Sequence, residues 1–318
     1  MYPRISDLTQ DLFGFEFPIP LYSFGLMVAV AILVATELTR REVERLYAVG
    51  RLPAATISEK NKKGRTVTRD VSPATLVLIL MVLAAAFGIA GSKLFHLIDY
   101  WEEFVQNPAE MLFSSSGLTF YGGLICATLG MAYYLRRKGQ PFFQWADAAA
   151  PGLILAYGIG RIGCYLAGDG DWGTCSRLED KPAFLPDWLW SETFPNNYLG
   201  VDVKEFVVSR GAICVEGADG VYPTMLYEFA MGVVLFAVLW ALRKHPFKAG
   251  WLFSLYLVFN AAERFLIEFI RINPVNAGIF SQSQLIAMGL FVLGVIGLFV
   301  FTRRRDPATL DPAPVTTG

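Results

Sequence analysis

The sequence predicts an all-α polytopic membrane protein with seven transmembrane helices and a small external cap between the fourth and fifth helices. Hydrophobic residues make up 54% of the 318 residues and charged residues only 17%, which is a more apolar composition than soluble domains have. The apolar residues gather in long runs that short clusters of Lys and Arg separate. A helix needs about 20 residues, at roughly 1.5 Å each, to cross about 30 Å of hydrocarbon, and every run is near that length.

The apolar runs give the predicted helices in chain order. They cover residues 20–36, 74–98, 118–135, 148–167, 224–242, 251–270 and 285–301. Between the fourth and fifth runs, residues 169–222 contain several prolines and tryptophans and are long enough to form the cap. We expect residues 1–305 to form a single membrane domain that includes this cap. The Pro/Thr/Ala-rich residues 306–318 are predicted to be a disordered cytoplasmic tail.

The distribution of basic residues predicts the orientation. Most of the 27 Lys and Arg follow the first, third, fifth and seventh runs. Cytoplasmic loops carry the excess of Lys and Arg, so the N-terminus is predicted outside and the C-terminus inside, which requires an odd number of crossings. Residues 42–71 are then a polar cytoplasmic linker. Because topology explains the basic clusters and the formal net charge is only -1, no nucleic-acid partner is expected.

Charged residues within the apolar runs mark the candidate site. Arg161 lies in the fourth run, and Arg264, Glu268 and Arg271 follow one another in or just after the sixth. Their spacings of four and three predict that the last three share one helix face. A charge in hydrocarbon costs several kcal/mol or more, so such residues indicate a functional site. A buried Arg264–Glu268 pair that only holds helices together is the alternative, but it does not explain Arg161.

Other polar groups are expected at the same depth, in the outer half of the bilayer. Three inward-running helices begin there with Tyr121, Gly122 and Gly123, with Tyr227 and Glu228, and with Ser281 and Gln284. The loop after the fourth run contains Asp169, Asp171 and Gly173, and glycines there free backbone N–H groups to contact an anion. We therefore expect this loop to contact a substrate.

The cysteines divide by location. Cys126 and Cys164 lie in apolar runs, where a thiol is most often a small core residue. Cys175 and Cys214 share the external segment, where an oxidising compartment allows a disulfide. No metal site and no cofactor is expected, because the chain has only two histidines and no CxxC motif.

Five motifs resemble those of the bacterial prolipoprotein diacylglyceryl transferases and follow one another along the chain in the same order as in that family. The longest runs from Asp147 through Pro151 to Arg161-Ile-Gly-Cys-Tyr-Leu-Ala-Gly-Asp-Gly-Asp-Trp-Gly173. Residues 119–123 are similar to the family's S/T-F-H-G-G, 223–228 to P-S/T-x-L-Y-E, 264–271 to R-F-x-x-E-x-x-R, and 281–284 to S-x-x-Q. With the predicted helices, the resemblance covers nearly the whole chain.

The resemblance implies an activity. Enzymes of this family move the diacylglyceryl group of phosphatidylglycerol to the lipobox cysteine thiol of a prolipoprotein signal peptide and release glycerol-1-phosphate. They work in the bacterial cytoplasmic (inner) membrane with membrane lipid as a partner, and the site here is expected toward the outer leaflet. Arginine suits this chemistry because its guanidinium binds phosphate oxygens in bidentate fashion and stays charged when buried.

The resemblance also suggests residue roles. Arg161 and Arg264 are predicted to hold the phosphate, Glu268 to orient Arg264, and Arg271, nearer the surface, to steer headgroups. Tyr121 completes the predicted catalytic set. The predicted substrate-binding residues are Gly122, Gly123, Asp169, Asp171, Gly173, Tyr227, Glu228, Arg271 and Gln284.

The chain departs from the family pattern at several site positions. Tyr121 replaces the histidine of H-G-G, Cys164 and Ala167 replace two asparagines, and either Asp169 or Asp171 stands for a glutamate. A tyrosine of pKa about 10 is a poor base for a thiol of about 8.5 unless cations stabilise its phenolate. A paralogue with an altered substrate is therefore one alternative. A lipid- or solute-handling transporter is another, but it predicts midplane sites in matched halves.

Overall fold

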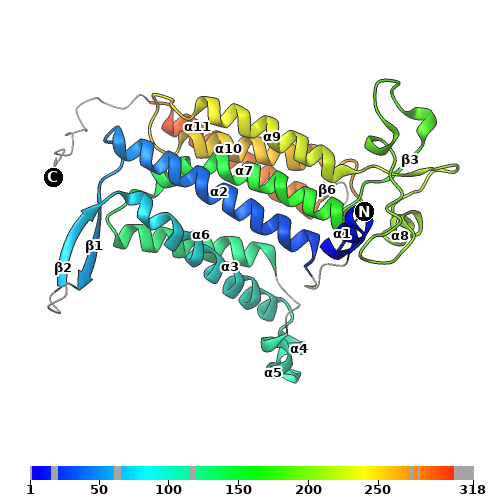
Figure 1. Cartoon of the computed structure of the whole chain (residues 1–318), viewed down its shortest axis with the longest axis horizontal. Helices are drawn as coiled ribbons and strands as arrows, with labels where there is room; N and C mark the ends of the chain where they lie inside the picture. Colours follow the sequence, from blue (N-terminus) through cyan, green and yellow to red (C-terminus); the bar gives the residue numbers. More distant parts are fainter. Residues whose placement is uncertain are drawn as a thin grey trace. The chain divides into compact units, whose positions relative to one another are not determined.

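The computed structural model describes residues 2–15, 21–60, 66–114, 119–272, 275–277 and 280–303, and Figure 1 shows their secondary structure. The chain divides into two compact units. Unit 1 comprises Met1–Leu38 and Asp147–Arg305, and unit 2 comprises Thr39–Ala146 and Asp306–Gly318. The predicted tail, 306–318, lies outside the described residues.

Five of the described helical segments are long and apolar enough to cross a membrane. They are α2 (Ser23–Ala48), η1 and α3 together (Pro73–Leu76 and Val77–Asp99), α7 (Phe142–Ala167), α9 (Thr224–Leu242) and α11 (Gln282–Phe301). This mostly helical chain is therefore a polytopic membrane protein. The two other predicted runs form α6 (Phe120–Arg137) and α10 (Trp251–Ile267), which have 18 and 17 residues. Seven crossings and the orientation stay predictions.

The all-α prediction misses three small antiparallel sheets among the described residues. They pair β1 (Ala55–Lys60) with β2 (Thr66–Val71), β3 (Cys175–Ser176) with β4 (Gly220–Val221), and β5 (Val275–Ala277) with β6 (Phe280–Ser281). The prediction of a linker over residues 42–71 is wrong, because α2 continues to Ala48 and the β1–β2 hairpin follows. An Arg40–Glu44 ion pair of 2.6 Å supports the helical extension, and β-branched residues favour the strands.

In unit 2, α3 and α6 pack closely through glycines. A Cβ atom at Gly122 would lie 2.6 Å from the carbonyl oxygen of Gly91, and one at Gly123 would lie 2.3 Å from Ser92 Oγ. Only glycine allows the two backbones to approach this closely. The short helices α4 (Trp101–Gln106) and α5 (Pro108–Phe113), which the apolar pattern did not predict, follow α3.

Unit 1 contains a group of four long helices, α7, α9, α10 and α11, which Figure 1 shows side by side. Helices α7 and α9 meet where a Cβ at Gly232 would lie 3.2 Å from Gly158 Cα. Asp147 near the start of α7 fixes the start of α10, because its carboxylate accepts hydrogen bonds from the N–H groups of Gly250 and Phe253, both at 2.8 Å. The short helix α1 (Ile5–Phe13) precedes α2.

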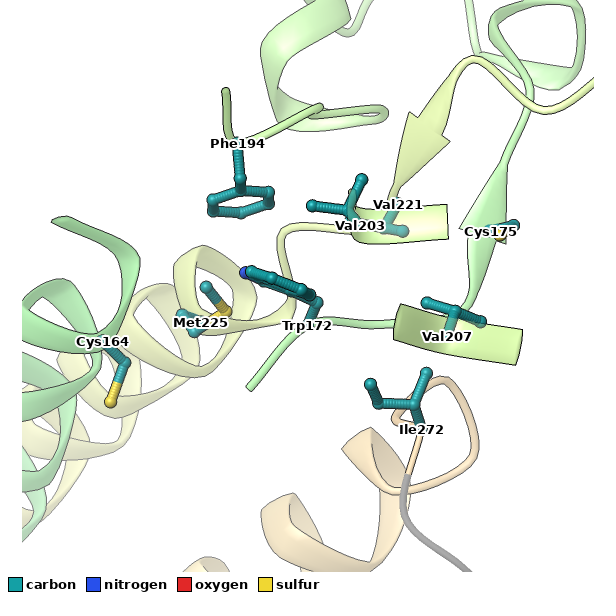
Figure 2. Packing of buried hydrophobic residues seen from close by; sticks show 9 residues of the cluster. All are labelled: Cys164, Trp172, Cys175, Phe194, Val203, Val207, Val221, Met225 and Ile272. Atoms are coloured by element: carbon teal, nitrogen blue, oxygen red, sulfur yellow. The ribbon is translucent and has the colours of Figure 1, made fainter. Parts of the chain in front are cut away.

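The predicted cap contains α8 (Val203–Ser209) and the single turns η2 (Leu178–Asp180) and η3 (Asp187–Leu189). Its apolar core also includes Cys164 of α7 and Met225 of α9. Figure 2 shows Trp172 beside Phe194, with Val203, Val207 and Val221 around them. The Trp172 ring is fully buried. A disulfide joins Cys175 and Cys214, as predicted. The cap core thus anchors the loop after Ala167, because Trp172 of this loop lies in it.

Candidate active site

Arg161, near the end of α7, is held between two carboxylates. Its Nε lies 2.5 Å from Glu228 Oε2 of α9, and its Nη1 pairs with Asp171 of the loop after α7. The guanidinium carbon also lies 5.1 Å from the centre of the Tyr157 ring, one helical turn earlier. These three contacts hold the Arg161 side chain in place.

Arg271 does not lie where the sequence predicted. Helix α10 ends at Ile267, so Arg271 is not on its face, and the side chain is buried within the protein. The chain turns after the helix and runs against the loop after α7, where Thr174 N–H donates to the Ile270 carbonyl at 2.8 Å. This backbone contact carries Arg271 inward, beside Arg161.

Four side chains form a closed set of ion pairs, which we call the ion-pair ring: Arg161, Arg271, Asp171 and Glu228. Arg271 Nη1 lies 2.8 Å from Glu228 Oε1, and Arg271 Nη2 lies 2.6 Å from Asp171 Oδ1. Each carboxylate therefore bridges both arginines. Two positive and two negative charges balance, which makes their burial tolerable. The Glu228 side chain is 0% exposed and that of Asp171 is 37% exposed, so the ring opens toward solvent at Asp171.

A second cluster surrounds Arg264. Its Nη2 lies 2.9 Å from Glu268 Oε2, and the same nitrogen donates to Ser283 Oγ at 3.0 Å. Ser281 Oγ donates to Glu268 Oε1 at 2.6 Å. This ion pair is the contact by which Glu268 can orient Arg264, as the sequence predicts. The S-x-x-Q motif is a helix capping box, in which Ser281 Oγ and Gln284 Oε1 accept from each other's backbone N–H.

Two arginine nitrogens at this site are buried without a hydrogen-bond partner among the described residues. They are Arg264 Nη1 and Arg271 Nε, and the latter is 4.0 Å from Glu268 Oε2. Buried N–H donors in proteins are almost always satisfied by protein, water or ligand atoms. These two donors thus point to an acceptor that binds between the ion-pair ring and the Arg264 cluster.

The two aspartates after α7 have different roles. Asp171 belongs to the ion-pair ring, whereas Asp169 Oδ1 accepts a hydrogen bond from the Asp171 N–H at 3.3 Å. Burial and the nearby Asp171 charge raise the pKa of Asp169. Burial acts against ionisation of Asp171 too, but Arg271 and Arg161 outweigh it and lower the pKa of Asp171. Of the two aspartates, Asp171 is therefore the anion that pairs with the arginines.

Cys164, Asp169 and Asp171 place one ligand atom each within 4.8 Å of one another. A cation there would have to displace Arg161 and Arg271 from the Asp171 carboxylate, because both its oxygens are already paired. The trio therefore carries no metal assignment. Cys164 itself is buried, as expected for a small core residue.

Several predicted substrate-binding residues have structural tasks. A Cβ at Gly173 would lie 2.9 Å from the Ile270 carbonyl oxygen, so glycine permits the close backbone contact that places Arg271. Tyr227 OH donates to the Leu189 carbonyl of the cap at 2.6 Å. Gly122 and Gly123 pack against α3 in unit 2, where Tyr121 also lies. Ligand contacts of these residues stay predictions.

The sequence reasoning missed two residues of the site, Tyr157 and Glu263. Tyr157 OH lies 2.5 Å from Glu228 Oε2 and 3.2 Å from Glu263 Oε1. The available signals were the spacing of four between Tyr157 and Arg161 and the second acidic residue within the sixth apolar run. Tyr157 joins the ion-pair ring through Glu228, and Glu263 joins it through Tyr157.

Comparison with known proteins adds the family. The family model described as prolipoprotein diacylglyceryl transferase matches residues 10–300. The chain belongs to the prolipoprotein diacylglyceryl transferase family. Among its relatives are proteins of Bacillus cereus (strain 03BB102), Bacillus thuringiensis subsp. konkukian (strain 97-27) and Bacillus anthracis. Each is 29% identical over 291 residues, which cover 91% of this chain and 90% of the relative, and each is named phosphatidylglycerol--prolipoprotein diacylglyceryl transferase.

Membership in this transferase family gives the geometry a chemical context. The family match extends over both units, and the ion-pair ring and the Arg264 cluster lie within it. An enzyme of this family must accommodate a phospholipid headgroup, and these clusters provide cationic groups in an otherwise apolar bundle.

Proposed function

We propose that this protein transfers the diacylglyceryl group of phosphatidylglycerol to the lipobox cysteine thiol of prolipoproteins and releases glycerol-1-phosphate. The names of the relatives supply the donor and the acceptor. The observation that carries the proposal is the group of Arg161, Arg264 and Arg271 in one helical unit, with two buried donor nitrogens that lack a hydrogen-bond partner among the described residues.

The lipid phosphate would bind between the two arginine clusters. Arg161 and Arg264 hold it, Glu268 orients Arg264 through their 2.9 Å ion pair, and Arg271 contributes its buried Nε. Asp171 is the exposed member of the ion-pair ring and occupies arginine N–H groups that a phosphate would use, so we assign it as the group that yields to the ligand. Bidentate guanidinium–phosphate bonds compensate for the loss of these ion pairs.

In the transfer step, the thiol sulfur bonds to the glycerol carbon that carries the phosphate ester, and that carbon–oxygen bond breaks. Its electron pair leaves with glycerol-1-phosphate, and the thiol proton passes to a base. Arginines fixed in a low-dielectric site stabilise the charge that develops on the leaving phosphate. We propose Tyr121 as the base, with Asp169, Asp171 and Glu268 as the other candidates. Gly122, Gly123, Gly173, Tyr227, Glu228 and Gln284 complete the proposed binding site.

We propose seven crossings, an external N-terminus and cap, and a single domain over residues 1–305 in the bacterial cytoplasmic (inner) membrane. The Cys175–Cys214 disulfide supports an external cap, because disulfides persist in oxidising compartments. The site at the cap end of α7 then faces the outer leaflet, where phosphatidylglycerol and the lipobox of a prolipoprotein signal peptide meet.

The test uses the purified full-length protein in mixed micelles. Phosphatidylglycerol and a lipobox peptide are supplied, and glycerol-1-phosphate release and the mass of the peptide are measured. We expect both signals together, and neither with a control peptide in which serine replaces the lipobox cysteine. Transfer from another phospholipid but not from phosphatidylglycerol would indicate a paralogue with an altered substrate and would contradict the proposal.

A further inference from the structure

Glu263 is a buried acid to which the proposed transfer gives no role. It lies in α10 and is only 3% exposed. Its Oε1 lies 3.2 Å from Tyr157 OH, whereas its Oε2 is buried and has no hydrogen-bond partner among the described residues. Buried polar groups are almost always satisfied by protein, water or ligand atoms. The unsatisfied Oε2 therefore marks a place for one more polar atom.

The hydroxyl of Tyr157 decides which kind of partner Oε2 can take. This hydroxyl has one hydrogen, and it lies 2.5 Å from Glu228 Oε2 and 3.2 Å from Glu263 Oε1. Glu228 pairs with Arg161 and Arg271, so it is a charged carboxylate and accepts that hydrogen at the shorter distance. Glu263 then contacts the Tyr157 oxygen as a carboxylic acid whose Oε1–H donates. Its Oε2 is left as a carbonyl oxygen, which accepts a hydrogen bond.

Glu263 is linked to both arginines that the proposed function assigns to the lipid phosphate. It directly precedes Arg264 in α10. Tyr157 connects it to Arg161, because the Tyr157 ring centre lies 5.1 Å from the Arg161 guanidinium carbon. An acceptor is thus added to a site where two buried N–H groups, Arg264 Nη1 and Arg271 Nε, lack an acceptor among the described residues.

This combination of donors with one acceptor matches a phosphate ester that also carries a hydroxyl group. Phosphate oxygens accept hydrogen bonds from guanidinium N–H groups, and a hydroxyl of the esterified alcohol can donate to a carbonyl oxygen. The glycerol headgroup of phosphatidylglycerol has two hydroxyls next to its phosphate. An ammonium headgroup could also donate, but the positive charges of Arg161 and Arg264 would repel it. A headgroup without a donor would leave Oε2 unsatisfied.

We propose that Glu263 is a specificity-determining residue, whose Oε2 accepts a hydrogen bond from a hydroxyl of the glycerol headgroup while the arginines hold the phosphate. This inference rests on the proposed function, which supplies phosphatidylglycerol as the donor lipid. The Glu263 Oε1–H keeps its bond with Tyr157, so no proton moves. A neutral acid adds no negative charge near the lipid phosphate, so Glu263 selects the headgroup without opposing phosphate binding.

Lipid binding to the purified full-length protein tests the selection without turnover. Native mass spectrometry in the absence of peptide compares phosphatidylglycerol with phosphatidylpropanol, which has the same charge and a three-carbon headgroup but no hydroxyl. The parent should bind phosphatidylglycerol about 10-fold more tightly, the effect of leaving one buried acceptor without a partner. Equal affinities for the two lipids would overturn the proposal.

Two substitutions of Glu263 separate its acceptor oxygen from the size of its side chain. Glu263→Met removes both oxygens and should abolish the preference by weakening the binding of phosphatidylglycerol alone. Glu263→Gln keeps a carbonyl oxygen and an N–H donor for Tyr157, so it should preserve most of the preference. Glu205→Met, the same replacement of an exposed acid in α8 of the cap, is the control and should behave like the parent. A parent-like preference in Glu263→Met would overturn the proposal, and so would its loss in Glu263→Gln.

Kinetics with the lipobox peptide distinguish this role from a purely structural one, with the mass of the peptide as the readout. In Glu263→Met the KM for phosphatidylglycerol should rise about 10-fold while kcat changes less, and the KM for phosphatidylpropanol should stay unchanged. Equal losses with both lipids would show a structural defect and overturn the proposal. Because the binding measurement needs no turnover, the expected binding without modification of the peptide would refute the proposed function and not the headgroup selection by Glu263.

Discussion

The ion-pair ring and the cap core meet in the loop after α7, where Asp171 belongs to the ring and Trp172 to the core. The two are stabilised differently. Asp171 pairs with two arginines, whereas the ring centre of its neighbour Trp172 lies 5.3 Å from that of Phe194 and 5.2 Å from that of Phe206. Apolar packing loses stability in proportion to the contacts removed. A buried set of balanced charges instead leaves an uncompensated charge when one member is removed. The cap should therefore tolerate changes that the ring does not.

The largest effect is expected at the ring. Arg161→Ala should abolish glycerol-1-phosphate release, a loss of about 10³-fold or more, because the leaving phosphate loses a preorganised cation. Arg161→Lys should also be impaired, since an ammonium cannot reproduce two parallel bonds. Rates are measured on protein that elutes as a single folded species. Near-normal turnover of Arg161→Ala, with Arg177→Ala of the cap as the matched control, would remove Arg161 from the phosphate site.

In the cap, Trp172→Ala should lower the free energy of unfolding by about 3–5 kcal/mol, the range for removing a large buried aromatic side chain. Thermal unfolding in detergent measures the change. Trp188→Ala, at a cap tryptophan that is 54% exposed, serves as the control and should change stability little. Equal effects of the two substitutions would show that the Trp172 core does not stabilise the cap.

The disulfide should contribute less than the tryptophan to the same core. Replacing Cys175 and Cys214 together by Ala should cost about 2–4 kcal/mol, because the bond restricts the unfolded chain across a sequence separation of 39 residues. The folded fraction should retain transfer activity, since the ring does not include either sulfur. Loss of activity without loss of stability would contradict this separation of cap and ring.

Tyr121 tests whether unit 2 takes part in the chemistry. If its hydroxyl acts on the thiol or the phosphate, Tyr121→Phe should reduce transfer by about 10²-fold, the range for a general base. A general base must lose its proton to act, so transfer by the parent should rise with pH through the ionisation of Tyr121, and this rise should be absent in the variant. Identical profiles at similar rates would exclude Tyr121 and direct the search for the base to Asp169, Asp171 or Glu268.

The smallest effect is expected for Cys164, whose Sγ lies 4.0 Å from Arg161 Nη1 at the edge of the ion-pair ring. Cys164→Ala should retain activity within a few fold, because direct transfer needs no nucleophile from the enzyme. Mass spectrometry of the intact protein during turnover provides the check. A diacylglyceryl group on Cys164 would overturn direct transfer.

The sequence predicted those parts of the site that depend on a single residue in an apolar context. Arg161, Arg264 and Glu268 are recognisable because charges are costly in hydrocarbon, and the Cys175–Cys214 bond followed from their shared segment. The place of Arg271 was not predictable from helical spacing, since α10 ends at Ile267 and a backbone contact with the next segment redirects the chain. A tertiary contact of this kind leaves no periodic signal.

Pairings across helices were equally hidden. Asp169 and Asp171 are equivalent in sequence, and only their positions relative to Arg161 and Arg271 distinguish them. Tyr157 and Glu263 are far apart in the chain, and nothing local indicates that they contact each other. Likewise, charged residues interrupt the β-branched pattern of β1 and β2, so the local sequence does not indicate the two strands.

The proposed transfer depends on the arginines of unit 1 holding the phosphate of the donor lipid. An electron cryo-microscopy structure of the full-length protein with phosphatidylglycerol tests it most directly. We expect the phosphate within hydrogen-bonding distance of Arg161 and Arg264, with Arg271 Nε as a further donor and the Asp171 carboxylate displaced. A phosphate bound elsewhere, with Arg161 still paired to both Asp171 and Glu228, would contradict it.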